Sequence, residues 1–167
     1  MLSAGREIER RFLVADHSIV RGRSGNRIAQ AYLFADSRTI LRVGRRHGGW
    51  RLTVKEADAR VARREFHAML PDPFGHELFD SPYARVSVKC RHPVEHAGRL
   101  WLVDVFEGAM KGLVLAEIEL SDEAERIDVP PWCGEEVTTV PGYSDHALAV
   151  PRRLVVTPRE RQEAEPW

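Results

Sequence analysis

The sequence has little cysteine, no net charge and no long hydrophobic run, and each of these features excludes a class of protein. Two cysteines, Cys90 and Cys133, are too few for a disulfide framework or a cysteine-rich zinc site, and we interpret both as small core residues. The 25 Lys and Arg residues balance 25 Asp and Glu residues, so overall charge provides no attraction to nucleic acid or to an anionic membrane. No apolar stretch approaches the ~18 residues of a membrane span, and the charges near the N-terminus argue against a secretory signal. The composition predicts a cytoplasmic protein.

The length of 167 residues, with 43% hydrophobic and 30% charged residues, predicts one globular domain. We expect this domain to span residues 1–150. Residues 151–167 mix Pro, Arg and Glu with little apolar periodicity, so we expect a loosely ordered tail. The oligomeric state stays open.

Strict alternation of apolar and polar residues recurs along the chain and predicts a mainly β, antiparallel fold. Glycine-containing turns at 47–49 and at 97–98 predict two hairpins. The expected helices, at 73–83, at 121–124 with Ser121 as N-cap, and at 143–149, are too few for an α/β fold. The alternation is clearest at residues 39–44, 50–55, 63–68, 87–91, 102–106 and 115–120.

The polar face of these predicted strands is strongly charged, and its charges are sorted by strand. Acids gather on the first and last strands and bases on the middle ones. A face exposed to water, where each cross-strand pair contributes ~0–1 kcal/mol, has no reason to be sorted in this way. A closed barrel with the charged face inside does, because the acids would hold a hard divalent cation and the bases a polyphosphate. The acids are Glu7, Glu9, Glu65, Asp104, Glu117 and Glu119, and the bases are Arg11, Arg42, Lys55, Arg63, Lys89 and Arg91.

The residues also resemble a known family. The opening Glu7-Ile8-Glu9-Arg10-Arg11 is similar to the ExExK signature of the CYTH domain, the triphosphate tunnel metalloenzymes, with arginine where lysine is usual. Similar pieces follow in the same order over residues 5–150, among them Leu52-Thr53-Val54-Lys55, Val103-Asp104-Val105-Phe106 and Ala116-Glu117-Ile118-Glu119-Leu120. The resemblance implies an eight-stranded antiparallel closed barrel with a few short flanking helices. It also implies a tunnel that hydrolyses a triphosphate with Mg²⁺ or Mn²⁺.

The resemblance further implies roles for the charged residues. Glu7, Glu9, Glu117 and Glu119 correspond to metal-coordinating acids, with Asp104 on the same wall and Glu65 as a further acid of the tunnel, so these six form the expected catalytic set. The six bases correspond to phosphate ligands. Inorganic tripolyphosphate, thiamine triphosphate and a nucleoside triphosphate all stay open as substrates.

Several positions depart from the family pattern. Ile40, Gly44, His67 and Leu102 stand where members commonly carry an acid, an arginine, a glutamate and an acid. Near Ser144 a basic residue is usual, and His146 is the nearest replacement. These changes predict a slow enzyme, or a tunnel that binds a polyphosphate or phosphorylated ligand without turnover; an adenylate cyclase is a third alternative.

Two further expectations concern partners and stability. Trp50, Trp101 and Trp132 lie in apolar surroundings typical of a core, so we do not expect a nucleic-acid partner. Bases that face one another in an empty tunnel would repel, so we expect Arg42→Ala and Lys89→Ala to weaken triphosphate binding and to stabilise the empty protein.

Overall fold

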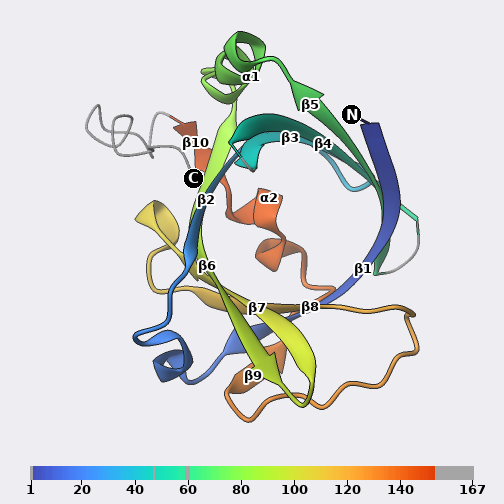
Figure 1. Ribbon diagram of the computed structural model, residues 1–167, viewed down its shortest axis with the longest axis vertical. Coiled ribbons are helices and arrows are strands. Elements are labelled where there is room, and N and C mark those ends of the chain that lie inside the picture. Colours follow the sequence, from blue (N-terminus) through green and yellow to red (C-terminus); the bar gives the residue numbers. More distant parts are fainter. Residues whose placement is uncertain (1, 47, 59–60, 153–167) are drawn as a thin grey trace.

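The computed structural model describes residues 2–46, 48–58 and 61–152. Its main feature is a ring of eight antiparallel strands, seen end-on in Figure 1. The strands are β1 (Leu2–Val14), β2 (Asn26–Ala35), β3 (Thr39–Arg46), β4 (Gly49–Ala57), β5 (Ala62–Leu70), β6 (Arg85–His96), β7 (Arg99–Phe106) and β8 (Val114–Glu119). They follow the order β6-β2-β3-β4-β5-β1-β8-β7, and β7 pairs with β6 again. The ring is therefore closed, which confirms the expected barrel.

The two hairpins expected from glycine-containing turns are present. Strands β3 and β4 pair from Thr39 opposite Glu56 to Arg46 opposite Gly49. Between β6 and β7, Ala97 and Gly98 have φ angles of 48° and 73°, the left-handed conformation that a tight two-residue hairpin needs at both positions. The local sequence therefore sets the register of both pairs.

Two short helices accompany the barrel. Helix α1 (Asp72–Phe79) is shorter than the predicted span and lies outside the ring, whereas α2 (Asp145–Leu148) lies inside it (Figure 1). The helix predicted at Ser121 is wrong. Residues 121–124 form bends and turns: the Ser121 hydroxyl donates to the Glu125 carboxylate at 2.7 Å instead of capping a backbone N–H, and the Ala124 N–H that it would cap donates to the Asp122 carboxylate at 2.8 Å. Within the described ranges, neither helix is long and apolar enough to cross a membrane.

Two further strands extend the sheet outside the ring. Strand β9 (Cys133–Glu136) pairs with β1, and β10 (Val150–Pro151) pairs with β6. The following Arg152 is buried, donates its backbone N–H to Ala84 and forms an ion pair with Asp80. The chain is thus attached two residues beyond the predicted boundary at 150. The rest of the predicted tail, 153–167, lies outside the described residues.

The main apolar core lies on the outer side of the barrel wall. Phe12 and Trp132 pack edge-on against the fully buried Trp101, with ring centroids 5.6 and 5.7 Å away. Trp50 is buried beneath α1, so all three predicted core tryptophans are confirmed. The two cysteines are free thiols that are only partly buried, which corrects their assignment as core residues. Cys133 still packs against this cluster.

Gly75 allows α1 to pack against the barrel. A Cβ atom at residue 75 would overlap the Trp50 side chain, so Gly75→Ala should lower the free energy of unfolding by about 1–3 kcal/mol, measured by urea denaturation. Gly5→Ala is the matched control, because a Cβ there meets nothing within 4 Å. Equal stability of the two variants would contradict this packing.

Candidate active site in the barrel lumen

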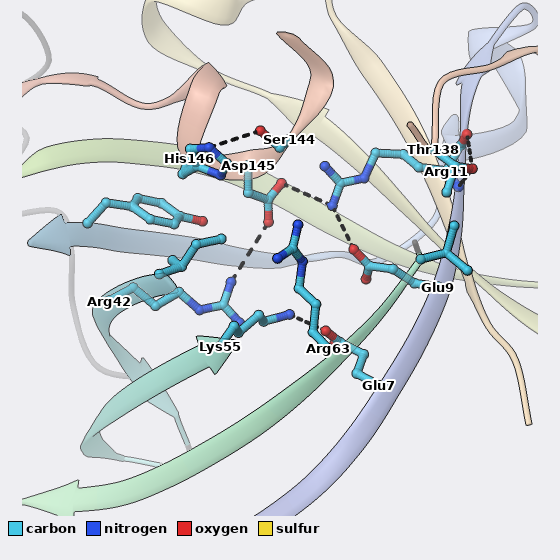
Figure 2. A pocket seen from close by; sticks show the side chains of 13 residues that line it. Glu7, Glu9, Arg11, Arg42, Lys55, Arg63, Thr138, Ser144, Asp145 and His146 are labelled. Carbon is cyan, nitrogen blue, oxygen red and sulfur yellow. Dashed lines mark hydrogen bonds and ion pairs between the residues drawn. The ribbon is translucent and has the colours of Figure 1, made fainter. Parts of the chain in front are cut away.

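One cavity opens into the barrel lumen, and half of the predicted site residues line it (Figure 2). Residues two positions apart on a strand face the same side, which explains why alternate charges reach one cavity. Arg42 comes from β3, Lys55 from β4 and Arg63 from β5. The strand β1 contributes Glu7, Glu9 and Arg11, and the remaining lining residues are Tyr32, Ile40, Val61, Thr138, Ser144, Asp145 and His146.

At one side of this cavity, Glu65 joins two bases. Its carboxylate lies 3.3 Å from Lys55 Nζ and 3.5 Å from an Arg42 guanidinium nitrogen. Burial opposes ionisation of Glu65, but Lys55 and Arg42 outweigh it and lower the pKa of the carboxyl. His67 Nε2 lies 3.1 Å from Glu65, and Lys55 also pairs with Glu7. Glu65 is therefore an ionised acid that holds bases in place.

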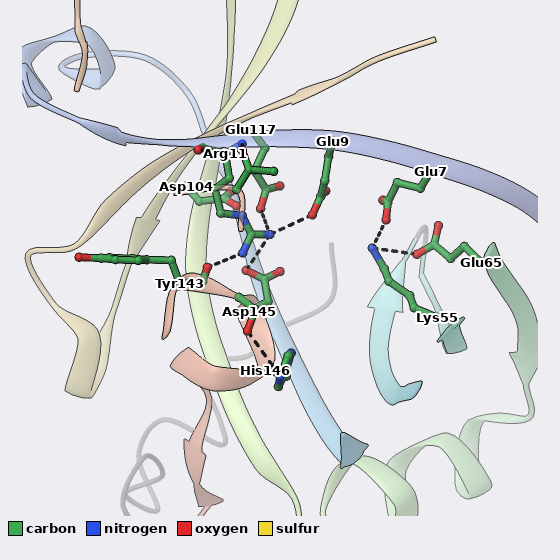
Figure 3. Close-up of polar contacts among 12 residues, drawn as sticks. Glu7, Glu9, Arg11, Lys55, Glu65, Asp104, Glu117, Tyr143, Asp145 and His146 are labelled. Carbon is green, nitrogen blue, oxygen red and sulfur yellow. Dashed lines mark hydrogen bonds and ion pairs between the residues drawn. The ribbon is translucent and has the colours of Figure 1, made fainter. Parts of the chain in front are cut away.

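Behind the cavity, four more predicted residues form a buried cluster of ion pairs. Asp104 is fully buried and accepts two hydrogen bonds of 2.6 Å from Arg91. Lys89 Nζ lies 2.7 Å from Asp104. Glu117 accepts from Arg11 at 2.6 Å (Figure 3) and from Arg91 at 2.5 Å. Burial of Glu117 is outweighed by Arg11, Lys89 and Arg91, which lower its pKa to about 2.

Asp145, the first residue of α2, was missed as a site residue. Its two carboxylate oxygens lie 2.9 and 3.1 Å from Lys89 Nζ, and guanidinium nitrogens of Arg11 and Arg42 lie at 3.7 and 3.9 Å. These bases outweigh burial and hold the pKa of Asp145 well below its usual value. The sequence signal for this site residue was an acid directly after Ser144, in the segment where the family resemblance implies a base.

His146, the expected replacement for that base, is not a cation at neutral pH. Partial burial and the nearby Arg63 lower its pKa. The residue that α2 presents to the lumen bases is thus an acid.

The predicted metal ligands differ in how far their charge is already neutralised. Glu9 and Glu119 are directly opposite on β1 and β8. Burial and the Glu117 carboxylate raise the pKa of Glu9, although Arg11 lies 3.2 Å away, and the exposed Glu119 side chain pairs with no described base. Two carboxylates with spare charge fit a hard divalent cation. Glu7 and Glu117, in contrast, are held by bases, and the described ranges contain no ready cluster of three or more acidic, histidine or cysteine ligands.

The departures from the family pattern are visible in the lumen wall. Ile40 is buried and lines the cavity, and Leu102 pairs in register with Glu117. Burial outweighs Glu65 and lowers the pKa of His67, so this side chain is neutral at pH 7. A Cβ at Gly44 would lie 3.1 Å from the Ala29 carbonyl oxygen, so an arginine there would press on β2.

Comparisons with known proteins agree with this geometry. No family model matches the chain. It is 34% identical to the inorganic triphosphatase of Acetivibrio thermocellus over 86% of this chain and 93% of the relative. It is 30% identical to the inorganic triphosphatase of Nitrosomonas europaea over 86% of this chain and 97% of that relative. A crystal structure of an inorganic triphosphatase has a TM-score of 0.60 at 31% identity, covering 86% of this chain and 93% of that one. The fold is shared with a putative adenylate cyclase from Bacillus halodurans. That structure has a TM-score of 0.57 at 14% identity and covers 72% of this chain and 83% of its own.

The expectation that Lys89→Ala stabilises the empty protein is wrong, because Lys89 faces the carboxylates of Asp104 and Asp145. These two acids outweigh burial and raise the pKa of the lysine. Removing one partner of a buried ion pair costs about 3–5 kcal/mol, so Lys89→Ala should lower the free energy of unfolding by that amount. Urea denaturation measures this, with the exposed Lys111→Ala as control. A variant as stable as the control would mean that the ion pairs of Lys89 contribute nothing to the stability of the fold.

Proposed function

The chain belongs to the CYTH family of triphosphate tunnel enzymes, and we propose that its lumen hydrolyses a triphosphate with a divalent metal ion. The observation that carries this proposal is the convergence of Arg11, Arg42, Lys55 and Arg63 on one cavity whose wall also holds acids. The names of the relatives favour inorganic tripolyphosphate as the substrate. A planar guanidinium group donates two parallel hydrogen bonds to phosphate oxygens, whereas a lysine contributes a point charge.

Among the cavity bases, Arg63 is the one best placed to meet the ligand first. Arg11, Arg42 and Lys55 each share their charge with carboxylates of the lumen, whereas Arg63 forms no ion pair with a described residue. A phosphate group reaches Arg63 without displacing an internal acid. Each of the other bases must exchange an acid for the phosphate or share itself between the two.

The opposite carboxylates of Glu9 and Glu119 would hold the metal ion, which we propose to be Mg²⁺ or Mn²⁺. When bound, such an ion neutralises phosphate charge and polarises the phosphorus–oxygen bond that breaks. Glu7 would reach it only by releasing Lys55, and Glu117 only by releasing Arg11 or Arg91. We assign Glu65 and Asp104 to holding lumen bases, so that the phosphate-binding nitrogen atoms are in place before the ligand arrives.

A second candidate function is binding without turnover. It is favoured by the apolar Ile40 and Leu102 at positions where the family commonly has acids, and by the internal pairing of Lys89 and Arg91.

One assay separates the candidate functions. The protein is incubated with tripolyphosphate, thiamine triphosphate or ATP and either metal ion, and orthophosphate, pyrophosphate and cyclic AMP are measured. Orthophosphate supports hydrolysis, whereas pyrophosphate with cyclic AMP indicates a cyclase. No product together with a raised melting temperature supports the binding protein, because a ligand at 100 times its Kd adds about 2.7 kcal/mol of stability.

Arg63→Gln tests the phosphate site. Loss of a charge-assisted hydrogen bond of about 1.5–3 kcal/mol should raise the KM or Kd for tripolyphosphate ~10- to 100-fold, with an unchanged melting temperature. Arg64→Gln is the matched control, because the neighbouring side chain points outward and pairs with Glu56. Equal affinities of the two variants would remove Arg63 from the site.

Glu9→Gln and Glu119→Gln test the metal site. Each should lower turnover at limiting metal at least ~100-fold, because a neutral amide replaces an anionic ligand of a hard cation. Glu77→Gln, on the exposed face of α1, should leave turnover unchanged. Full activity of both tunnel variants would exclude this pair as metal ligands.

A second prediction concerns how the stability of Glu9→Gln depends on pH. The folded-state pKa of Glu9 is raised above the unfolded-state value, so this carboxyl costs stability as the pH rises from the unfolded-state pKa to the folded-state pKa, and the full cost is present above it. Glu9→Gln should therefore melt at a higher temperature than the wild type at pH 7–8. The difference should disappear as the pH falls below the unfolded-state pKa of a glutamate, about 4.3, where the wild-type carboxyl is protonated in both the folded and the unfolded chain. A variant that melts lower at pH 7–8 would contradict this charge balance.

A further inference from the structure

Asp145 is a buried acid at the centre of the bases, and metal binding does not account for it. We propose that the Asp145 carboxylate occupies the position of one phosphate group of the substrate, so that a triphosphate binds in competition with this side chain. The inference rests on the proposed function, because it takes the lumen bases to be phosphate ligands. It assigns Asp145 a role in determining which form of the triphosphate the lumen accepts.

The contacts of Asp145 are those of a small anion in a phosphate site. Lys89 approaches both carboxylate oxygens, at 3.1 and 2.9 Å, while Arg11 and Arg42 approach one oxygen each, at 3.7 and 3.9 Å. The three bases come from three different strands, β6, β1 and β3. Phosphate groups are bound in the same way, by cations that converge on several oxygens. Figure 2 shows the Asp145 carboxylate between Arg11 and Arg42, and Figure 3 shows its contact with Arg11.

The Asp145 side chain lies between the cavity and the buried Lys89. Asp145 lines the cavity, together with Arg11 and Arg42. Lys89 has only 2% of its surface exposed and is not part of the cavity lining. A ligand that enters the cavity therefore meets the carboxylate before it meets Lys89, and it reaches Lys89 only if the carboxylate gives way.

The segment that carries Asp145 is anchored on both sides. Leu148 is buried with Phe106 and Leu115 on one side of the lumen. The carbonyl oxygen of Ala149 accepts a hydrogen bond from Arg85, and that of Tyr143 accepts one from Arg11, both at 2.5 Å. The acid is thus held in the lumen by the fold, so a ligand that binds Lys89, Arg11 or Arg42 has to compete with it.

The competition depends on the charge of the ligand. A metal-free triphosphate carries about four negative charges, and like charges brought together in a poorly solvated site repel strongly. A divalent ion bound to the phosphates reduces that repulsion. Asp145 should therefore discriminate most strongly against the metal-free anion, which makes tripolyphosphate in a chelator the sharpest probe.

Asp145→Asn should fold, because each base keeps another acid. Lys89 keeps Asp104, Arg11 keeps Glu117, and Arg42 keeps Glu65. The amide also preserves the size of the side chain and one oxygen acceptor. The substitution thus removes the charge and little else.

The experiment is calorimetric titration of the full chain with sodium tripolyphosphate in the presence of EDTA, with melting curves for each protein. Asp145→Asn should bind at least ~10-fold more tightly than the wild type, because one competing charge is gone. Asp145→Glu keeps the charge and should stay within about threefold of the wild type. Asp128→Asn, an equal charge change at a side chain that is 75% exposed, should do the same.

Equal or weaker binding by Asp145→Asn would overturn the inference, as would a variant that fails to fold or an equal gain in Asp145→Glu. An absence of tripolyphosphate binding in every protein would overturn it too, together with the assignment of the bases. If Asp145→Asn binds more tightly while no protein releases orthophosphate, the hydrolytic function fails and the competition stands. If all the proteins hydrolyse tripolyphosphate and bind it equally well, only the inference fails.

Discussion

Charges inside a closed barrel are stable only when bases and acids lie side by side, because a buried charge without a partner costs several kcal/mol. The buried charges of this lumen meet that condition through ion pairs between β6, β7, β8 and α2. Arg91 is held by Asp104 and Glu117, and Lys89 by Asp104 and Asp145. The rest of the site follows from this pairing, since a ligand can bind a base only by replacing, or by sharing, the acid that already holds it.

The charged lumen also determines where the apolar core lies. Alternation along each strand sends one set of side chains inward and the other outward, so a lumen filled with charge leaves the apolar set on the outer wall. The loop between β8 and β9 covers part of that wall, where Trp132 packs on Trp101. Elsewhere the cover is thinner: Trp50 lies beneath α1, whereas Phe66 keeps 39% of its surface exposed. Stability and function are therefore built on opposite faces of the same strands.

The proposed function uses both the paired and the unpaired charges. Paired bases are already oriented when a triphosphate arrives, which favours stabilisation of charge in the transition state over tight binding of the ground state. Arg63, without a partner among the described residues, supplies the first attraction. Spare negative charge lies mainly on Glu9 and Glu119, which face each other on the neighbouring strands β1 and β8. Asp145 then competes with the triphosphate for the lumen bases, so the affinity of the lumen for a triphosphate depends on the balance between these charges.

The sequence by itself determined most of the strands and the set of inward-facing charges, because alternation is a local property that each strand carries in its own residues. The closed eight-stranded barrel was implied by the resemblance to the CYTH family and not by the alternation. The sequence also determined the turn at Ala97 and Gly98, where two residues must adopt positive φ. Local signals failed at Ser121, whose hydroxyl donates to Glu125 while the Ala124 N–H that it would cap donates to Asp122. Only the tertiary structure decided which acid holds which base, since Lys89 and Asp145 are 56 residues apart and meet through the closure of the ring and the entry of α2. Pairing across the lumen depends on distances between strands, and no periodicity within one strand encodes them.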